Sequence, residues 1–165
     1  MFNIGDSVVM NGYGICTVAA IGHPELRNAD PEKLYYTLSP SGEAGYVHVP
    51  VDSQSIRPVI SAAEARALIA SIPERKVSVN RSRDRQLRYK STLKDGSPED
   101  LMLMVMEIYQ TELSQAKGKR AFSQDTAFRE GEKRLNEELA LALGVKAEEV
   151  HSIIEKSIAH SKNKR

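Results

Sequence analysis

The sequence predicts an α+β protein, in which residues 1–57 form a small β unit and residues 58–165 form an all-α helical domain. Up to Arg57, short β-branched runs alternate with Gly, Pro and Asn turn residues, whereas from Ser61 onward the apolar residues recur with a helical period. With 165 residues, of which 41% are apolar and 27% charged, the chain can build one ordinary domain or two small ones around a packed core.

The β unit is indicated by apolar runs that end at turn residues, at positions 8–10, 15–21, 34–38 and 45–49. Asn11-Gly12 is a turn dipeptide that joins the first two runs into a hairpin. We expect the last run to end at Pro50, because proline has no N–H to donate to a strand ladder. Short strands at this spacing, five in all, are typical of a half-open barrel of the SH3 or Tudor type, which usually leaves a strand edge exposed.

The helical domain begins with a capping box, in which the Ser61 hydroxyl and the Glu64 carboxylate each satisfy an orphan N–H of the first turn. Pro73 is expected to stop this helix. Ser97-Pro98, followed by two acids, opens a second helix. The apolar face of that helix is expected to comprise Leu101, Met104, Val105, Ile108 and Tyr109.

Two further helices are predicted downstream. Residues 123–125 are expected to cap the first, which Gly144 ends, and the second covers residues 147–159. We expect Met104 to pack inward, with Met102 and Met106 at the flanks of its apolar stripe. The paired acids at 137–138 and 148–149 are expected on solvated faces, and the apolar face before Gly144 is expected to hold Phe128, Leu135, Leu139, Leu141 and Ala142.

No arrangement of residues predicts an enzyme or a cofactor site. The only cysteine, Cys16, excludes an intramolecular disulfide, fits a reducing cytosol, and lies in a β-branched run where a buried, inert thiol is expected. The four histidines lack ligand spacing, and Gly12 and Gly14 precede a strand instead of the helix that a phosphate loop requires. With neither a signal peptide nor a membrane-length apolar run, we expect a cytoplasmic protein that binds no membrane, metal, cofactor or small-molecule substrate.

Positive charge is concentrated in residues 75–94, which carry eight basic side chains against one acid, Asp84. Such density costs self-repulsion unless a polyanion such as a phosphate backbone relieves it. The charge therefore favours contact with nucleic acid, and the alternative is a solvated linker helix. Lys133 and Arg134 extend the basic surface if their helix packs alongside. On a helix, the segment would present one row of guanidiniums with further basic residues beside it: Arg81, Arg85 and Arg88, then Arg83, Lys90 and Lys94.

The order of these segments resembles the bacterial CarD family (CarD/CdnL) of transcription factors that bind RNA polymerase, over almost the whole chain. Each motif alone is weak, whereas their order and spacing together are fairly specific. The N-terminal module is also similar to the polymerase-binding module of the transcription-repair coupling factor. The resemblance lies in FNIGDSVVM at 2–10 with YG at 13–14, YVHVP at 46–50, LRYK at 87–90, SPEDL at 97–101, and GEKR at 131–134 leading to EELA at 137–140.

The resemblance implies that residues 1–57 form a Tudor-like module that pairs a strand edge with the β subunit of RNA polymerase. The residues implied at that contact are Arg27, Tyr46, Val47, His48 and Val49. It further implies that the helical domain lies against promoter DNA near the upstream edge of the bubble and modulates open-complex stability. The residues implied at the DNA are Arg81, Arg83, Arg85, Arg88, Lys90, Lys133 and Arg134.

Two positions depart from the family pattern. His48 stands where relatives often carry an Arg, so we expect a weaker or differently charged polymerase contact. Arg85 stands where relatives commonly place a Trp that wedges into the minor groove, and Arg instead reads a narrow groove and its phosphates. We expect Arg88→Glu to weaken DNA association and flatten its salt dependence. The alternative function is a polymerase-bound interaction adaptor without DNA wedge activity.

Overall fold

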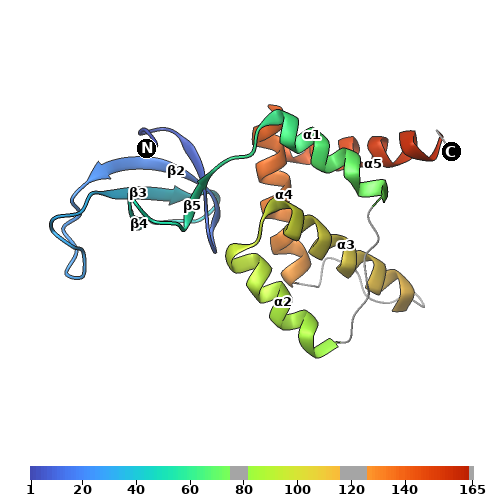
Figure 1. Cartoon of the computed structure of the whole chain (residues 1–165), viewed down its shortest axis with the longest axis horizontal. Helices are drawn as coiled ribbons and strands as arrows, with labels where there is room; N and C mark the ends of the chain where they lie inside the picture. The colour runs from blue at the N-terminus through green and yellow to red at the C-terminus, as the bar shows by residue number, and fades with distance from the viewer. Residues whose placement is uncertain (75–81, 116–125, 164–165) are drawn as a thin grey trace. The chain divides into compact units, whose positions relative to one another are not determined.

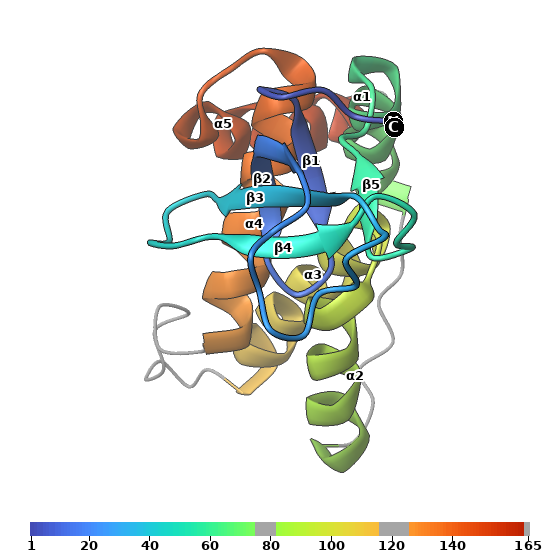
Figure 2. The same ribbon diagram turned by 90° about the vertical axis from the view of Figure 1, so that its left-hand side faces the viewer.

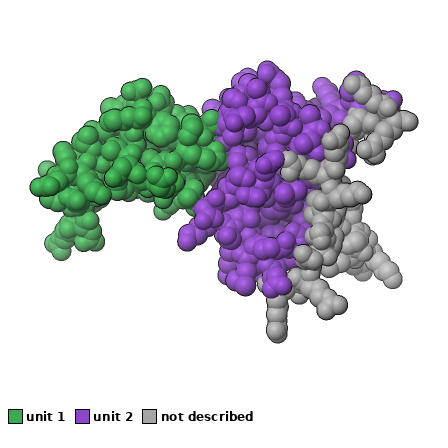
Figure 3. Space-filling model, viewed as in Figure 1, with its two compact units in different colours: residues 1–59 green, residues 60–165 purple. Residues whose placement is uncertain are grey.

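The computed structural model describes residues 1–74, 82–115 and 126–163. The chain divides into two compact units, Met1–Val59 and Ile60–Arg165, coloured green and purple in Figure 3. The boundary expected after Arg57 falls inside the last strand of the first unit. None of the helices in the described part of the chain is long and apolar enough to span a membrane.

The N-terminal unit is a single antiparallel sheet of five strands, β1 (Ser7–Met10), β2 (Gly14–Gly22), β3 (Tyr35–Pro40), β4 (Val47–Pro50) and β5 (Ile56–Pro58). Their order in the sheet is β4-β3-β2-β1-β5, so β4 and β5 are its two edges. Four strands follow the predicted apolar runs, whereas β5 forms over a segment without such a run, by pairing with β1. The predicted fold class is thereby confirmed for this unit.

The sheet curls into a half-open barrel, and Figure 2 shows β3 and β4 running across the direction of β1. The register of β2 against β3 shifts between Val18 and Ala20, which marks a β-bulge in β2. A β-bulge increases the local twist of the sheet. The concave side holds a small core of Val8, Cys16, Val18, Tyr36, Leu38 and Val49. The Tyr36 hydroxyl accepts a hydrogen bond from the Phe2 N–H at 2.9 Å, which ties the N-terminal segment to the barrel.

Strand β4 ends at Pro50, as expected, although the missing N–H is not the reason. Pro50 pairs with Tyr35, and the Val51 N–H still donates to the Leu34 carbonyl at 3.0 Å. In an antiparallel ladder, hydrogen-bonded pairs alternate with pairs whose backbone groups point outward. Because Leu34 and Val51 form a hydrogen-bonded pair, Pro50 occupies an outward position, where its missing N–H costs the ladder nothing.

The second unit consists of α1 (Ala62–Ser71), the 3₁₀ turn η1 (Ile72–Glu74), α2 (Ser82–Asp95), α3 (Pro98–Gln115), α4 (Thr126–Leu143) and α5 (Ala147–Lys162) (Figure 1). The predicted capping box is present: the Ser61 hydroxyl accepts from the Glu64 N–H, and the Glu64 carboxylate accepts from the Ser61 N–H. Helix α4 contacts α1, α2, α3 and α5, and is therefore the centre of the unit. The expected cap at 123–125 lies outside the described residues.

Three side chains of this unit correct the sequence-based expectations. Met102 is buried with Met104 instead of flanking it, because α3 packs against both α2 and α4 and so buries a wider face. Leu141 is exposed, because it lies two residues, or about 200°, beyond the buried Leu139 on α4. Glu138 is not solvated: it is 2% exposed, and its carboxylate accepts a hydrogen bond from the Ile60 N–H at 3.3 Å.

Candidate functional site

The N-terminal unit has an open strand edge at β4, one of the two edges of its sheet. Within residues 1–59, all of which are described, β4 pairs with β3 on one side only. The pairs Tyr36–Val49 and Leu38–Val47 fall on the hydrogen-bonded positions that the Leu34–Val51 contact establishes. The N–H and C=O of His48 therefore point away from β3, toward the open edge. An unpaired donor and acceptor on an edge strand is a template for a further strand.

The side chains along β4 divide between the core and the surface. Val49 is buried, so among the residues expected at this contact its side chain belongs to the barrel core. His48 is half-buried, and its Nδ1 lies 3.1 Å from the Thr37 hydroxyl on β3. Val47 is half-buried as well, and the Tyr46 ring just before the strand is 66% exposed. The edge thus presents backbone groups beside an exposed aromatic ring.

Arg27 lies on the loop between β2 and β3, near the end of β4 that is opposite to Tyr46. Residues 23–34 connect β2 to β3, and β3 begins at Tyr35, the partner of Pro50 in β4. The Tyr35 hydroxyl accepts from the Asp30 N–H at 3.0 Å, which fastens the loop to the sheet. Arg27 itself is exposed.

Burial of the Cys16 thiol, reinforced by the charge of Glu43, raises its pKa to about 11. Its side chain faces the barrel core and its Sγ lies 3.7 Å from the Gly14 carbonyl oxygen, to which the thiol donates. A thiol with so high a pKa is a poor nucleophile at neutral pH, so this residue belongs to the barrel core, as expected.

In the helical unit, the basic residues of α2 do not share one face. Tyr89 is buried and marks the inner side of the helix. Arg85, one turn earlier, is half-buried on that side. Lys90 and Lys94 are exposed. Arg83 is also a residue of α2, and Arg81 lies outside the described residues.

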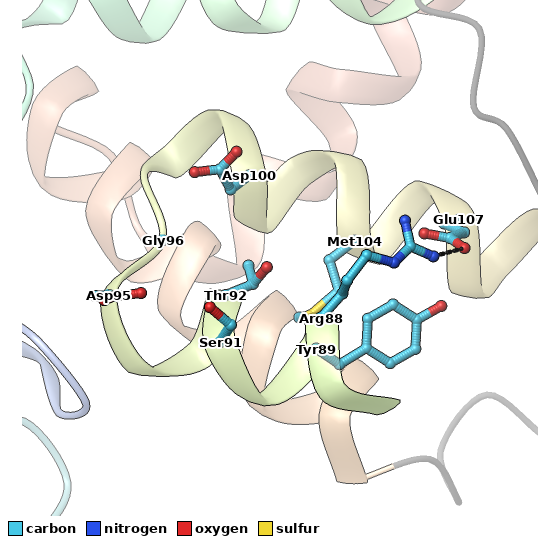
Figure 4. Close-up of a pocket in the computed structure, with 9 residues that line it drawn as sticks. All are labelled: Arg88, Tyr89, Ser91, Thr92, Asp95, Gly96, Asp100, Met104 and Glu107. Carbon is cyan, nitrogen blue, oxygen red and sulfur yellow. Dashed lines mark hydrogen bonds and ion pairs between the residues drawn. The ribbon is translucent and has the colours of Figure 1, made fainter. Parts of the chain in front are cut away.

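Arg88 is held by a carboxylate from the next helix. Its Nη2 lies 2.9 Å from Oε1 of Glu107 on α3, whose side chain is only 8% exposed, whereas the Arg88 side chain is 46% exposed. The pair closes one end of a pocket of about 390 Å³ between α2 and α3, whose other end is lined by Asp95, Gly96 and Asp100 (Figure 4). Arg88 therefore neutralises a buried acid as well as facing solvent.

Arg134 has a similar structural role on α4. Its Nε donates to Glu130 at 2.8 Å, and its Nη1 donates to the Leu93 carbonyl of α2. Its side chain is only 14% exposed. Arg134 thus joins the end of α2 to α4, while the neighbouring Lys133 is exposed.

The structure therefore separates the basic residues expected at the DNA into two groups. Arg88 and Arg134 make ion pairs within the unit, whereas Lys90 and Lys133 face solvent. Sequence reasoning missed Glu107, whose burial depends on the packing of α3 against α2. It also missed the exposed Leu87, whose position two residues before Tyr89 could have placed it opposite the buried side of α2.

The N-terminal unit matches a known domain family. Residues 2–60 match the model of the CarD-like/TRCF RID domain, the RNA polymerase-interacting domain, and this match covers the five-stranded unit. No curated protein matches the chain. The N-terminal unit of this chain therefore matches the CarD-like/TRCF RNA polymerase-interacting domain, and this match is consistent with the CarD/CdnL family.

Proposed function

We propose that this protein is a bacterial transcription regulator that docks on the β subunit of RNA polymerase through the open edge of β4 and contacts promoter DNA through α2. The domain family of residues 2–60 supports a transcription-related role in binding RNA polymerase. The proposal adds the β subunit, the promoter DNA near the upstream edge of the bubble, and modulation of open-complex stability. It also takes the protein to act in the cytoplasm and without catalysis.

The open edge of β4 is the observation that carries the docking proposal. The outward-facing N–H and C=O of His48 can extend the sheet by one strand of a partner. Main-chain hydrogen bonds supply affinity in this mode, and neighbouring side chains supply specificity. Tyr46, which is exposed directly before β4, and Arg27, on the loop at its other end, are suited to that second task.

The DNA contact is supported by the charge and exposure of α2. The helix carries five basic side chains against two acidic ones, a net charge of +3 over 14 residues. Lys90 and Lys94 are exposed and can approach phosphates. A regulator that is tethered to polymerase and binds melted promoter more tightly than duplex shifts the closed-to-open equilibrium toward the open complex by linkage.

His48→Pro tests the docking edge. The substitution removes the outward N–H while leaving both hydrogen bonds of Val47 and Val49 to β3, and the edge already accommodates Pro50 at an equivalent outward position. We expect binding to the cognate RNA polymerase, measured by biolayer interferometry, to weaken about tenfold, the factor that corresponds to one hydrogen bond of roughly 1.4 kcal/mol.

His48→Ala is the matched control, because it deletes the imidazole and keeps the backbone donor. We expect it to bind within about threefold of the wild type, a difference of under 1 kcal/mol. Thermal melting shows whether each variant keeps its fold. A folded His48→Pro variant with wild-type affinity would exclude pairing along β4. An equal loss in both variants would assign the contact to the imidazole instead.

One observation favours a second candidate, a polymerase-bound adaptor whose helical unit meets an acidic protein surface. Arg88 and Arg134, both expected at the DNA, already have carboxylate partners within the unit. An adaptor predicts no salt-sensitive binding of the full-length protein to promoter fragments, whereas the regulator predicts a steep loss of affinity with added salt.

A further inference from the structure

The ion pair between Arg88 and Glu107 joins a solvent-facing cation to a buried acid. Nη2 of Arg88 lies 2.9 Å from Oε1 of Glu107, and the two side chains are 46% and 8% exposed. Because so much of Arg88 is exposed, its guanidinium can turn toward an anion in the solvent. The Glu107 carboxylate, in contrast, stays between α2 and α3 whether or not the cation is present. The pair is therefore one that an external anion can break from the Arg88 side.

The pocket beside this pair offers Glu107 no replacement cation. Of the described residues that line the pocket, Arg88 alone is basic, whereas Asp95 and Asp100 are two further acids (Figure 4). Asp84, which is exposed four residues before Arg88 on α2, adds a negative charge to the same helix face. If Arg88 left for a phosphate, the buried carboxylate would lose its counterion in surroundings that also repel the phosphate.

We propose that the Glu107 carboxylate is an autoinhibitory contact, which competes with DNA phosphate for the Arg88 guanidinium. This inference rests on the proposed DNA contact of α2 and adds the residue that regulates it. While Arg88 is paired with Glu107, its charge is neutralised, so it releases no counterion from a phosphate. Contact of Arg88 with DNA requires the exchange of carboxylate for phosphate. The cost of leaving Glu107 buried without its partner then lowers the affinity for DNA.

The consequence is that DNA contact by α2 depends on polymerase docking. A free protein whose Arg88 is neutralised binds duplexes weakly, and non-specific DNA therefore competes less for it. A protein held on polymerase meets promoter DNA at a high effective concentration, which offsets the cost of breaking the pair. Glu107 thus favours contact within the polymerase complex over contact with bulk DNA.

The ion pair between Arg134 and Glu130 does not permit the same exchange. The Arg134 side chain is only 14% exposed, and its Nη1 also donates to the Leu93 carbonyl of α2. Removal of the Glu130 charge would therefore leave Arg134 between α4 and α2. The two pairs allow a matched comparison, because the same Glu→Leu change frees a guanidinium for phosphate at Glu107 and not at Glu130.

The test measures the affinity of the full-length protein for a fluorescein-labelled promoter duplex by fluorescence anisotropy, between about 50 and 200 mM salt. We expect Glu107→Leu to steepen the slope of log affinity against log salt by about 0.9, the value for one further phosphate contact. The same contact should raise the affinity roughly eightfold in about 0.1 M salt. Thermal melting shows whether the variant is folded. If Glu107→Leu does not fold, the isosteric Glu107→Gln takes its place with the same expectation.

Two control variants assign the gain to Arg88. Glu130→Leu should keep the wild-type affinity and salt slope, because Arg134 stays in place. The double variant Arg88→Met and Glu107→Leu removes the guanidinium that Glu107→Leu releases, and its slope should return to the wild-type value. If the steeper slope persists in the double variant, another residue makes the new phosphate contact, which overturns the inference.

The outcomes separate this inference from the function on which it rests. If the wild type binds the duplex with a steep salt slope and folded Glu107→Leu has the same slope and affinity, the competition is wrong and the DNA contact stands. A weaker affinity in folded Glu107→Leu would show that the carboxylate positions Arg88 for DNA, which also overturns the inference. If neither the wild type nor Glu107→Leu binds the duplex at low salt, the inference and the proposed DNA contact both fail.

Discussion

Replacing Arg88 by methionine tests whether this residue serves first to neutralise Glu107 in the fold. The Glu107 carboxylate is 8% exposed and lies 2.9 Å from the Arg88 guanidinium. Methionine keeps much of the length and volume of the Arg88 stem and removes the charge. The variant therefore leaves an acid buried between α2 and α3 without its cationic partner.

The magnitude lies between two limits. Breaking a fully buried pair costs about 3–5 kcal/mol, and an exposed pair contributes about 0.2–1 kcal/mol. Here the acid is buried while 46% of the Arg88 side chain is exposed, and the adjoining pocket of about 390 Å³ can admit water to the carboxylate. We therefore expect a loss of about 2 kcal/mol in the free energy of unfolding, which lowers the melting temperature of a unit of this size by roughly 8 °C.

A double-mutant cycle followed by far-ultraviolet circular dichroism isolates the pair. Glu107→Leu alone leaves a guanidinium that can turn toward water, so it should cost less than Arg88→Met. The double variant replaces the pair by two apolar groups and should recover most of the loss, with a coupling energy of at least about 1 kcal/mol. A melting temperature for Arg88→Met within roughly 2 °C of the wild type, together with near-zero coupling, would refute this reasoning.

The ion pair between Arg88 and Glu107 makes Arg88 a poor position at which to test DNA binding by substitution. Arg88→Glu would place a second carboxylate beside Glu107, and like charges at that distance destabilise the fold. A weaker DNA affinity in Arg88→Glu would therefore combine the effect of unfolding with that of removing a phosphate-binding group. Lys90 and Lys94, which are exposed, are the cleaner positions for testing the charge of α2.

Two further predictions concern single residues. Because the pKa of Cys16 is raised to about 11, roughly one thiol in a thousand is a thiolate at pH 8. A disulfide reagent such as DTNB should therefore label Cys16 only after unfolding, or as the pH approaches that pKa. Rapid labelling of the native protein at pH 8 would contradict the burial of the thiol. A Cβ on Gly96 would lie 2.6 Å from the Thr92 carbonyl oxygen, so Gly96→Ala should destabilise the helical unit by about 1–3 kcal/mol in a thermal melt. Gly22→Ala, whose Cβ meets nothing within 4 Å, is the control, and equal melting of the two variants would show that the turn after α2 relaxes freely.

Expectations that depend on neighbouring residues in the chain were confirmed. The Ser61 capping box needs only Glu64 three residues later, and the turn at Asn11-Gly12 needs only a glycine that accepts a positive φ, which Gly12 has at 82°. The period of apolar residues likewise indicated the helices that follow Ser61. The motif order that resembled the CarD family was confirmed over residues 2–60 by the domain match.

Expectations about which side of an element faces outward were less secure. Strand β4 ends at Pro50 as expected, but the missing N–H is not the cause, because the register turns the Pro50 nitrogen toward the edge instead of toward β3. Met102 and Glu138 are buried because α3 and α4 pack on more than one side, and the period of a single helix does not reveal how many neighbours it has. The DNA-contact residues that the family resemblance implied remain predictions.

The sequence by itself determined the two-part architecture, the caps and turns, and the concentration of basic residues, because these follow from backbone preferences and charge over a few residues. The tertiary structure decided which of the charges are already paired. Arg88 and Glu107 are 19 residues apart, and Glu138 and Ile60 are 78 apart, so only the packing of helices brings these groups together. The packing of α2 leaves Leu87 facing outward, and the pairing of β4 with β3 leaves the His48 backbone at the open edge, since burial and pairing depend on elements that are distant in the chain.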